Sequence, residues 1–167
     1  MIIVAIGESH DRKAFDCGVV ALNDFLQKTA FQHREKGLSN TFVLADDDKP
    51  ERILGFFTLS FLEVEITAIP KEHSRHLPRQ SRLPAAKLAR LAVDKTCQGK
   101  GYGDILVADA IKRIMNTAND SGAIIGLFVD AKDENTMRFY LRFGFLPLLD
   151  SPRKLFIPLK QLAAGKT

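Results

Sequence analysis

The sequence predicts an α/β (α+β) domain with a mixed central sheet flanked by helices. Its 167 residues are 46% hydrophobic and 26% charged, a balance that suits one compact core. The second half of the chain alternates apolar and amphipathic runs in the order β-α-β-α-β, which is typical of helices that cover a sheet. No internal repeat or linker divides the sequence, so we expect a single domain over residues 1–167.

The first half of the chain predicts one helix and two strands. Residues 19–32 are expected to form an amphipathic helix, because Leu22, Phe25, Leu26 and Thr29 fall at helical spacing. Two β-prone runs follow, residues 40–45 and residues 52–66, with the turn sequence DDDKPE between them.

The second half predicts a strand at KLARLAVD (87–94), which leads into a glycine-rich run, and a helix over 104–118. Its expected inward residues are Ile105, Leu106, Ala108, Ile111 and Met115. A buried strand at 123–130 precedes a short helix, ENTMRFYLRF, with Asp133 as its N-cap and Gly144 at its end. The predicted last strands cover 145–149 and 154–159.

Charge and cysteine content exclude several classes of protein. The net charge of +4 arises from 24 Lys and Arg against 20 Asp and Glu, which is only mildly basic. Cys17 and Cys97 form no CxxC pair, which favours a reduced cytoplasmic protein over a disulfide scaffold or a zinc module. No apolar run is long enough to span a membrane. His73 and His76 have no third ligand nearby, so no metal site is expected.

The run QGKGYGD at residues 98–104 places glycine at alternate positions beside Lys100. It does not match the P-loop, which needs four residues between its glycines and then Lys followed by Ser or Thr. It does not match GxGxxG either, because Asp104 stands where the third glycine would be needed. The order here is a strand, then the motif QxxGxG, then a helix. This order would bring backbone N–H groups together at the helix N-terminus, which favours binding of an anion. A plain turn with positive φ needs only one glycine, so three glycines favour a phosphate site.

Here the sequence resembles a known family. LARLAVDKTCQGKGYGDIL is similar to the pyrophosphate-binding segment of the GNAT acyl-CoA N-acyltransferases, and DAKDENTMRFYLRFGF is similar to that family's last helix and strand. The segment FDCG at 15–18, the ALNDFL helix and the closing LFIPL together resemble the TacT/AtaT-type toxins. Those toxins acetylate aminoacyl-tRNA and are paired with a ribbon-helix-helix antitoxin. The resemblance covers nearly the whole chain and also implies a homodimer.

The resemblance implies specific roles along the chain. The backbone of the strand before the glycine run would pair with the pantetheine amides of acetyl-CoA, as an added strand does, and the run itself would surround the pyrophosphate. Asn135 matches a side-chain contact to the pantetheine arm, although a polar residue in the first turn of a helix explains it equally well. The cofactor-binding residues implied are Leu91, Val93, Gln98, Gly99, Lys100, Gly101, Gly103, Asp104 and Asn135.

Tyr140 matches the position where this family places a hydroxyl near the thioester sulfur, which implies a general acid. Met137, Tyr140 and Leu141 share one predicted helix face, so the ring should point inward; a core tyrosine without a catalytic role is the alternative. The carbonyl would be polarised by a backbone N–H near Val93.

The strand LARLAV carries no acid, although many GNAT enzymes have a glutamate base there. Glu63 and Glu65 could act through water or simply face solvent. An α-amino group titrates near 7.7–8.0 in peptides, well below a lysine ε-amine near 10.4, and the adjacent ester of an aminoacyl-tRNA lowers its pKa further. Such an amine is largely neutral at cellular pH, so a strong base is not required. The missing acid therefore favours an aminoacyl substrate.

The stretch from Pro70 to Arg90 is rich in basic residues, with Glu72 as its one acid. It is a candidate tRNA surface, by contacts to phosphates, and equally a solvated loop. The residues expected to contact tRNA are Arg75, Arg79, Arg82, Lys87 and Arg90.

Three functions stay open from the sequence. The leading one is an N-acetyltransferase toxin that uses acetyl-CoA to acetylate the α-amine of aminoacyl-tRNA and so blocks translation. The second keeps the fold but acts on a small amine, a peptide or a protein amine. The third is a non-catalytic acyl-CoA-binding module, against which Tyr140 argues.

Overall fold

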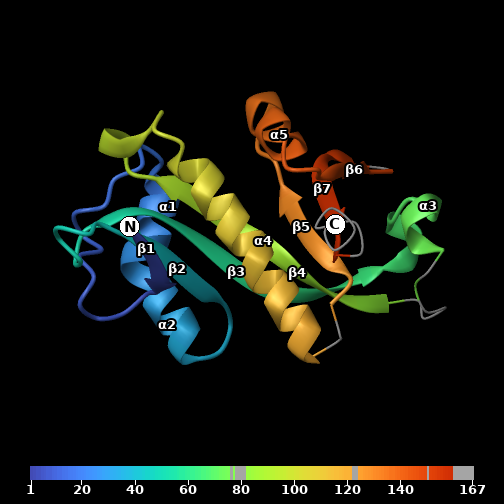
Figure 1. Ribbon diagram of the computed structural model, residues 1–167, viewed down its shortest axis with the longest axis horizontal. Coiled ribbons are helices and arrows are strands. Elements are labelled where there is room, and N and C mark those ends of the chain that lie inside the picture. The colour runs from blue at the N-terminus through green and yellow to red at the C-terminus, as the bar shows by residue number, and fades with distance from the viewer. Residues whose placement is uncertain (76, 78–81, 122–123, 150, 160–167) are drawn as a thin grey trace. The chain divides into compact units, whose positions relative to one another are not determined.

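The structure is a computed structural model that describes residues 1–75, 77, 82–121, 124–149 and 151–159. His76 and Arg79 lie outside the described residues. The chain forms two compact units, Met1–Ser60 with Ala89–Ile111 and Phe61–Leu88 with Lys112–Thr167. The strands β3 (Ile53–Glu65) and β4 (Arg82–Val93) run through both units (Figure 1). A seven-stranded mixed sheet with helices is present, which confirms the predicted fold class; the extent of the single domain stays a prediction.

In the first unit the strands follow in the order β1-β2-β3-β4. Strand β1 (Ile2–Ala5) pairs antiparallel with β2 (Asn40–Ala45), and β2 pairs antiparallel with the first part of β3. The sequence predicts β2 and β3 but not β1, because a run of four strand residues has too little alternation to stand out.

A helical run from Val20 to Glu35 covers one face of these strands. It consists of α1 (Val20–Asp24), the π-helical turn η1 (Phe25–Thr29) and α2 (Ala30–Glu35). The predicted helix is therefore confirmed, with a wide turn inside it. Phe25 and Leu26 from this run pack with Phe56 of β3 in one buried cluster.

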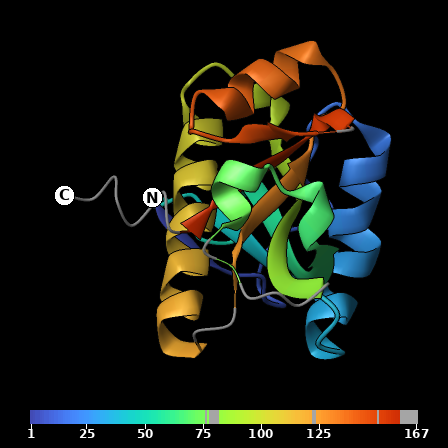
Figure 2. The same cartoon turned by 90° about the vertical axis from the view of Figure 1, so that its right-hand side faces the viewer.

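Helix α4 (Tyr102–Ser121) follows the 3₁₀ turn η3 (Lys95–Cys97), and its first half covers the opposite face of the first unit's strands (Figure 2). Gly55 of β3 faces this helix, because a Cβ added there would lie 2.9 Å from a methyl group of Leu106. The added Cβ would also lie 3.0 Å from the Ala92 carbonyl oxygen, so a side chain at this position would crowd both the Leu106 side chain and the neighbouring strand.

The predicted inward face of α4 was partly wrong. Ile105 is 42% exposed and Ala108 is exposed. The apolar residues of this helix spread over more than one face, so the sequence pattern alone does not fix which face turns inward. The buried positions are Leu106, Val107, Ala110, Ile114 and Met115.

In the second unit the strands follow in the order β3-β4-β5-β7-β6. Strand β5 (Gly126–Asp130) pairs parallel with β4 over Ala86–Leu88, and antiparallel with β7 (Ser151–Pro158). Strand β6 (Leu146–Leu148) lies at the edge, antiparallel to β7. The helices are η2 (Ile66–Ala68), α3 (Lys71–Ser74) and α5 (Glu134–Leu141).

The basic stretch 70–90 is only partly a loop, which corrects the expected extent of β4. This strand begins at Arg82 and not at residue 87, so three of the proposed tRNA contacts lie on it. No described helix is long and apolar enough to cross a membrane.

Candidate active site

The glycine-rich run forms a loop of free backbone N–H groups at the start of α4. The φ angles are 78° at Gly99 and 82° at Gly101, so both need glycine. Two of the three glycines are therefore explained by backbone conformation, which corrects the expectation that one would suffice. Within the described chain, no acceptor is recorded for the amides of residues 99–103. A helix N-terminus with free amides and Lys100 beside it suits a phosphate.

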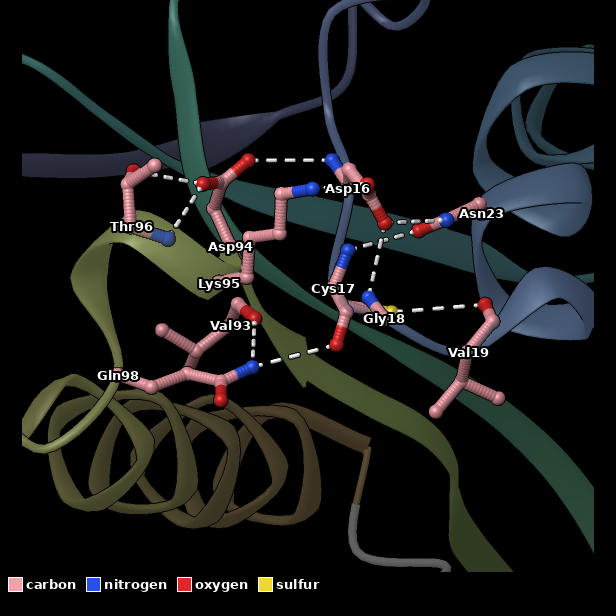
Figure 3. A network of polar contacts seen from close by, with 10 residues as sticks. All are labelled: Asp16, Cys17, Gly18, Val19, Asn23, Val93, Asp94, Lys95, Thr96 and Gln98. Carbon is pink, nitrogen blue, oxygen red and sulfur yellow. Dashed lines mark hydrogen bonds and ion pairs between the residues drawn. The ribbon is translucent and has the colours of Figure 1, made fainter.

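A clamp of side-chain hydrogen bonds holds this loop against the segment FDCG (Figure 3). The Asp94 carboxylate accepts from the Thr96 amide at 3.0 Å and the Thr96 hydroxyl at 2.7 Å. It also accepts from the Asp16 amide at 3.1 Å. Burial acts to raise the pKa of Asp94, but these hydrogen bonds outweigh it and hold the pKa below its usual value.

Asp16 is the second carboxylate of the clamp. It lies 2.9 Å from the Lys95 ammonium, and it accepts hydrogen bonds from the Gly18 amide and the Asn23 side chain. Lys95 is the main cause that lowers the pKa of Asp16 to about 2. The clamp therefore stays ionised at neutral pH and ties the start of α1 to the end of β4.

The role of Asp16 and Asp94 in this clamp was not predicted from the sequence. The segment FDCG entered only through its resemblance to the toxins, and Asp94 only as the end of a strand. The signal available was an aspartate directly before Cys17-Gly18 and another directly after LAV. Since 78 positions separate them, only the fold reveals that they share one network.

Gln98 supports the loop with its side chain. Its amide nitrogen donates to the carbonyl of Cys17 at 3.2 Å and to that of Val93 at 3.0 Å. The side chain is thus used to hold three chain segments together, and any contact of Gln98 with a phosphate would come from its backbone. Its place in the predicted pyrophosphate site stays a prediction.

The end of β4 presents backbone groups on its free side. The Asp94 amide donates to the Leu54 carbonyl of β3 at 2.9 Å. Because backbone groups of alternate strand residues point to opposite sides, the amides of Leu91 and Val93 point away from β3. This direction suits the predicted pairing with the amides of pantetheine, as with an added strand.

Tyr140 lies in the last turn of α5 in the second unit. Its side chain is 5% exposed, and its ring contacts Phe139 and Phe145 edge-on at centroid distances of 5.1 and 5.5 Å. Burial raises its pKa to about 12. No hydrogen bond to a described residue is recorded for its hydroxyl, and no fully buried described polar atom lacks a partner. The oxygen therefore reaches the surface and is available to a ligand.

The other residues of α5 agree in part with the predictions. Asp133 caps the helix, because its carboxylate accepts from the Thr136 amide at 2.8 Å. The helix ends at Leu141, two residues earlier than expected, and Gly144 in the turn after it has φ of 95°. Leu141 is 38% exposed, so its predicted inward position was wrong. Asn135 is exposed and accepts a hydrogen bond from Arg138, which leaves its amide nitrogen available.

A cavity of about 320 Å³ opens in the second unit. Leu62, Val64, Phe128 and Leu148 give it apolar walls. Its polar lining includes Glu65, one of the two glutamates considered as a base, and the ion pair between Lys87 and Asp130, with nitrogen and oxygen 2.8 Å apart. A mostly apolar cavity with a few charged groups is the usual form of a small-molecule site.

The sequence matches the acetyltransferase (GNAT) family over residues 9–145. The chain belongs to this family. The matched residues include the clamp, the glycine loop and Tyr140.

The similar proteins and solved structures within this family are toxins. The chain is 30% identical to a probable toxin TacT of Sinorhizobium fredii over 90% of this chain and 86% of that one. It is 32% identical to a tRNA-acetylating toxin of Mycobacterium tuberculosis over 95% and 92%. The structure is similar to AtaT complexed with acetyl-methionyl-tRNAfMet, with a TM-score of 0.91, 32% identity and 99% of both chains covered. It is also similar to a Tyr-to-Phe mutant of AtaT bound to acetyl-CoA and the C-terminus of the antitoxin AtaR, with a TM-score of 0.81, 30% identity and coverage of 99% and 98%.

The basic residues of this GNAT protein have different environments. Arg75 and Arg82 are exposed, and no described carboxylate pairs with either. Lys87 is paired with Asp130, and Arg90 lies over the ring of Phe25. They are therefore not equivalent as tRNA contacts.

Replacement of Gly103 with Val is expected to weaken acetyl-CoA binding about tenfold or more, because a branched side chain would stand where phosphates approach the loop. Gly103 lies in α4 and is not among the described glycines with positive φ, so Val adds no backbone strain there. Calorimetric titration with acetyl-CoA measures the effect. Ala108→Val, on the exposed side of the same helix, is the control. Unchanged affinity in Gly103→Val would place the phosphates elsewhere.

Proposed function

We propose that this protein transfers the acetyl group of acetyl-CoA to the α-amine of aminoacyl-tRNA and thereby blocks translation, as the toxin of a toxin–antitoxin pair. The observation that carries the proposal is the clamped loop of free N–H groups at the N-terminus of α4. The identity to a tRNA-acetylating toxin and the similarity to AtaT complexed with acetyl-methionyl-tRNAfMet support the choice of acceptor.

The proposed chemistry is acyl transfer from a thioester. The neutral α-amine attacks the acetyl carbonyl, the C–S bond breaks, and the coenzyme A thiolate takes the proton of Tyr140. The amine loses its proton to solvent, from which Tyr140 is protonated again. Because the pKa of Tyr140 is raised to about 12, the acid form persists throughout the physiological range.

The acceptor's side chain is proposed to enter the cavity of the second unit. The walls formed by Leu62, Val64, Phe128 and Leu148 favour an apolar side chain. The charged groups at the same cavity are Glu65, Lys154 and the paired Lys87 and Asp130, so the lining has no excess of either charge.

The partner and the location follow from this reaction. An antitoxin is expected as the partner, because AtaT has been solved bound to the C-terminus of AtaR. We propose a cytoplasmic location, where acetyl-CoA and charged tRNA occur together. The homodimer implied by the sequence resemblance stays a prediction.

The test of this function is transfer of labelled acetyl from acetyl-CoA to charged tRNA. We expect label on aminoacyl-tRNA and none on the same tRNA after deacylation. Mild alkali should then release the label as the N-acetyl amino acid, because the ester bond breaks and the amide bond does not.

Two parallel reactions separate the alternative functions. A polyamine and a peptide with a free N-terminus serve as acceptors under the same conditions. A higher kcat/KM on either of them would contradict the tRNA assignment. Absence of turnover on every acceptor, with acetyl-CoA bound, would favour the non-catalytic module.

A further inference from the structure

Arg90 is held in an unusual position on β4. Its guanidinium carbon lies 3.7 Å from the centroid of the Phe25 ring, which is stacking distance. Among the other described cation–π pairs, Arg12 lies 5.4 Å from Phe31, and Arg142 lies 5.5 Å from Phe139. The guanidinium plane of Arg90 is therefore fixed more closely than in these pairs.

The ring under Arg90 is itself fixed. Phe25 is 6% exposed, it stacks on Phe56 with centroids 6.5 Å apart, and the His33 ring meets it edge-on at 5.8 Å. Phe25 also begins the π-helical turn η1, and such turns occur frequently at functional sites. The helical run and β3 thus form a rigid support for one cationic side chain.

The donors of Arg90 remain unused in the described chain. No hydrogen bond or carboxylate partner to a described residue is recorded for its guanidinium, whereas Lys87 and Lys95 each pair with an aspartate. Burial lowers the pKa of Arg90, yet a guanidinium stays charged at neutral pH. A partly desolvated cation with free donors favours an anionic ligand, and its planar fork suits phosphate.

The position of Arg90 argues against the phosphates of acetyl-CoA as this ligand. Its side chain lies on Phe25, which belongs to the helical run on one face of the sheet, and the glycine loop leads into α4 on the opposite face (Figure 2). Arg90 precedes Val93 by three residues, which is about 10 Å along a strand. This backbone separation is short enough for the arginine side chain to reach a phosphate next to the reacting ester.

We propose that Arg90 binds the phosphate of the 3′-terminal adenosine of aminoacyl-tRNA and thereby positions the aminoacyl ester for acetylation. In that substrate only one ribose separates the ester from the nearest phosphodiester, so this phosphate lies close to the reacting ester. Arg90 is then a positioning residue for the acceptor. This inference rests on the proposed function and names one contact within it.

Two minimal acceptors test the contact. The first is a 3′-aminoacyl adenosine, which has no phosphate, and the second is the aminoacyl ester of the dinucleotide CpA, which has the terminal phosphodiester. For the wild type we expect kcat/KM to be about tenfold or more higher for the dinucleotide, since a hydrogen bond to a charged group contributes on this scale.

Arg90→Gln should remove this preference and bring the two values within about twofold of each other. The adenosine ester itself should react as with the wild type. Arg90→Lys keeps the charge but loses the planar fork, so it should retain only part of the preference. Arg12→Gln, which changes the pair with Phe31 on the same unit, is the control and should keep the wild-type ratio.

Each outcome decides one point. An Arg90→Gln variant that keeps the wild-type preference would overturn the contact. An equal fall in kcat/KM for both esters would show that Arg90 only supports the fold around Phe25, and Arg90→Lys would repeat the test if the Gln variant did not fold. A wild type that acetylates neither ester nor charged tRNA would overturn the proposed function itself.

Discussion

Tyr140→Phe is expected to slow acetyl transfer by about 10²–10⁴-fold, the usual contribution of one positioned general acid. The free energy of unfolding and the affinity for acetyl-CoA should change little. The Tyr140 ring packs edge-on against Phe139 and Phe145, and a Phe ring keeps these contacts. The loss should therefore arise in kcat, with the KM for acetyl-CoA nearly constant.

The dependence of kcat on pH gives a second, independent measurement. Burial raises the pKa of Tyr140 to about 12, so the hydroxyl should keep its proton well above neutral pH. We expect the wild-type profile to show no fall caused by this group below about pH 10. Turnover of the Phe variant near the wild-type rate at saturating substrates would exclude Tyr140 as the acid.

The sequence predicts the parts of this fold that depend on local periodicity. The strands predicted at 40–45 and 52–66, the α5 cap at Asp133 and the glycine turn at Gly144 all rest on local pattern or turn chemistry. The inward face of α4 could not be predicted with the same success. Its apolar residues allow more than one face, and the choice between them depends on packing against strands that are distant in the sequence.

The site was predictable only where its residues are adjacent in the chain. The loop at 98–104 has its motif in seven consecutive residues, so its place before a helix was predictable, whereas the positive φ at both Gly99 and Gly101 was not. The clamp and the Arg90 support join residues that are far apart in sequence, Asp16 with Asp94 and Phe25 with Arg90. Contacts of this kind leave no periodicity or spacing in one sequence, so the fold is needed to find them.

The proposed tRNA surface is tested by charge reversal at Arg75 and Arg82. Both residues are exposed, so Glu can replace them without a buried charge. We expect the double variant to lower kcat/KM on charged tRNA on the order of 100-fold at low salt, because two phosphate contacts become repulsive. Acetyl-CoA affinity should stay constant, since the proposed phosphate loop is a different segment of the chain.

Salt dependence distinguishes phosphate contacts from other causes. Each phosphate contact contributes about 0.9 to the slope of log affinity against log salt, so the slope for the double variant should be smaller by about 2. The control is Lys36→Glu with Lys112→Glu, which gives the same change in net charge at two other exposed positions. If the control lost as much activity as the Arg75 and Arg82 variant, total charge would explain the effect.

The same measurement distinguishes charged tRNA from a small amine as the acceptor. A small amine has no phosphate backbone, so an enzyme that acts on one should lose little kcat/KM by these reversals at any salt concentration. Equal rates for the wild type and the variant on charged tRNA at low salt would remove Arg75 and Arg82 from the tRNA surface. The proposed contact of Arg90 would not be affected by that result, because it is carried by the stack on Phe25 and tested with acceptors that contain one phosphate or none.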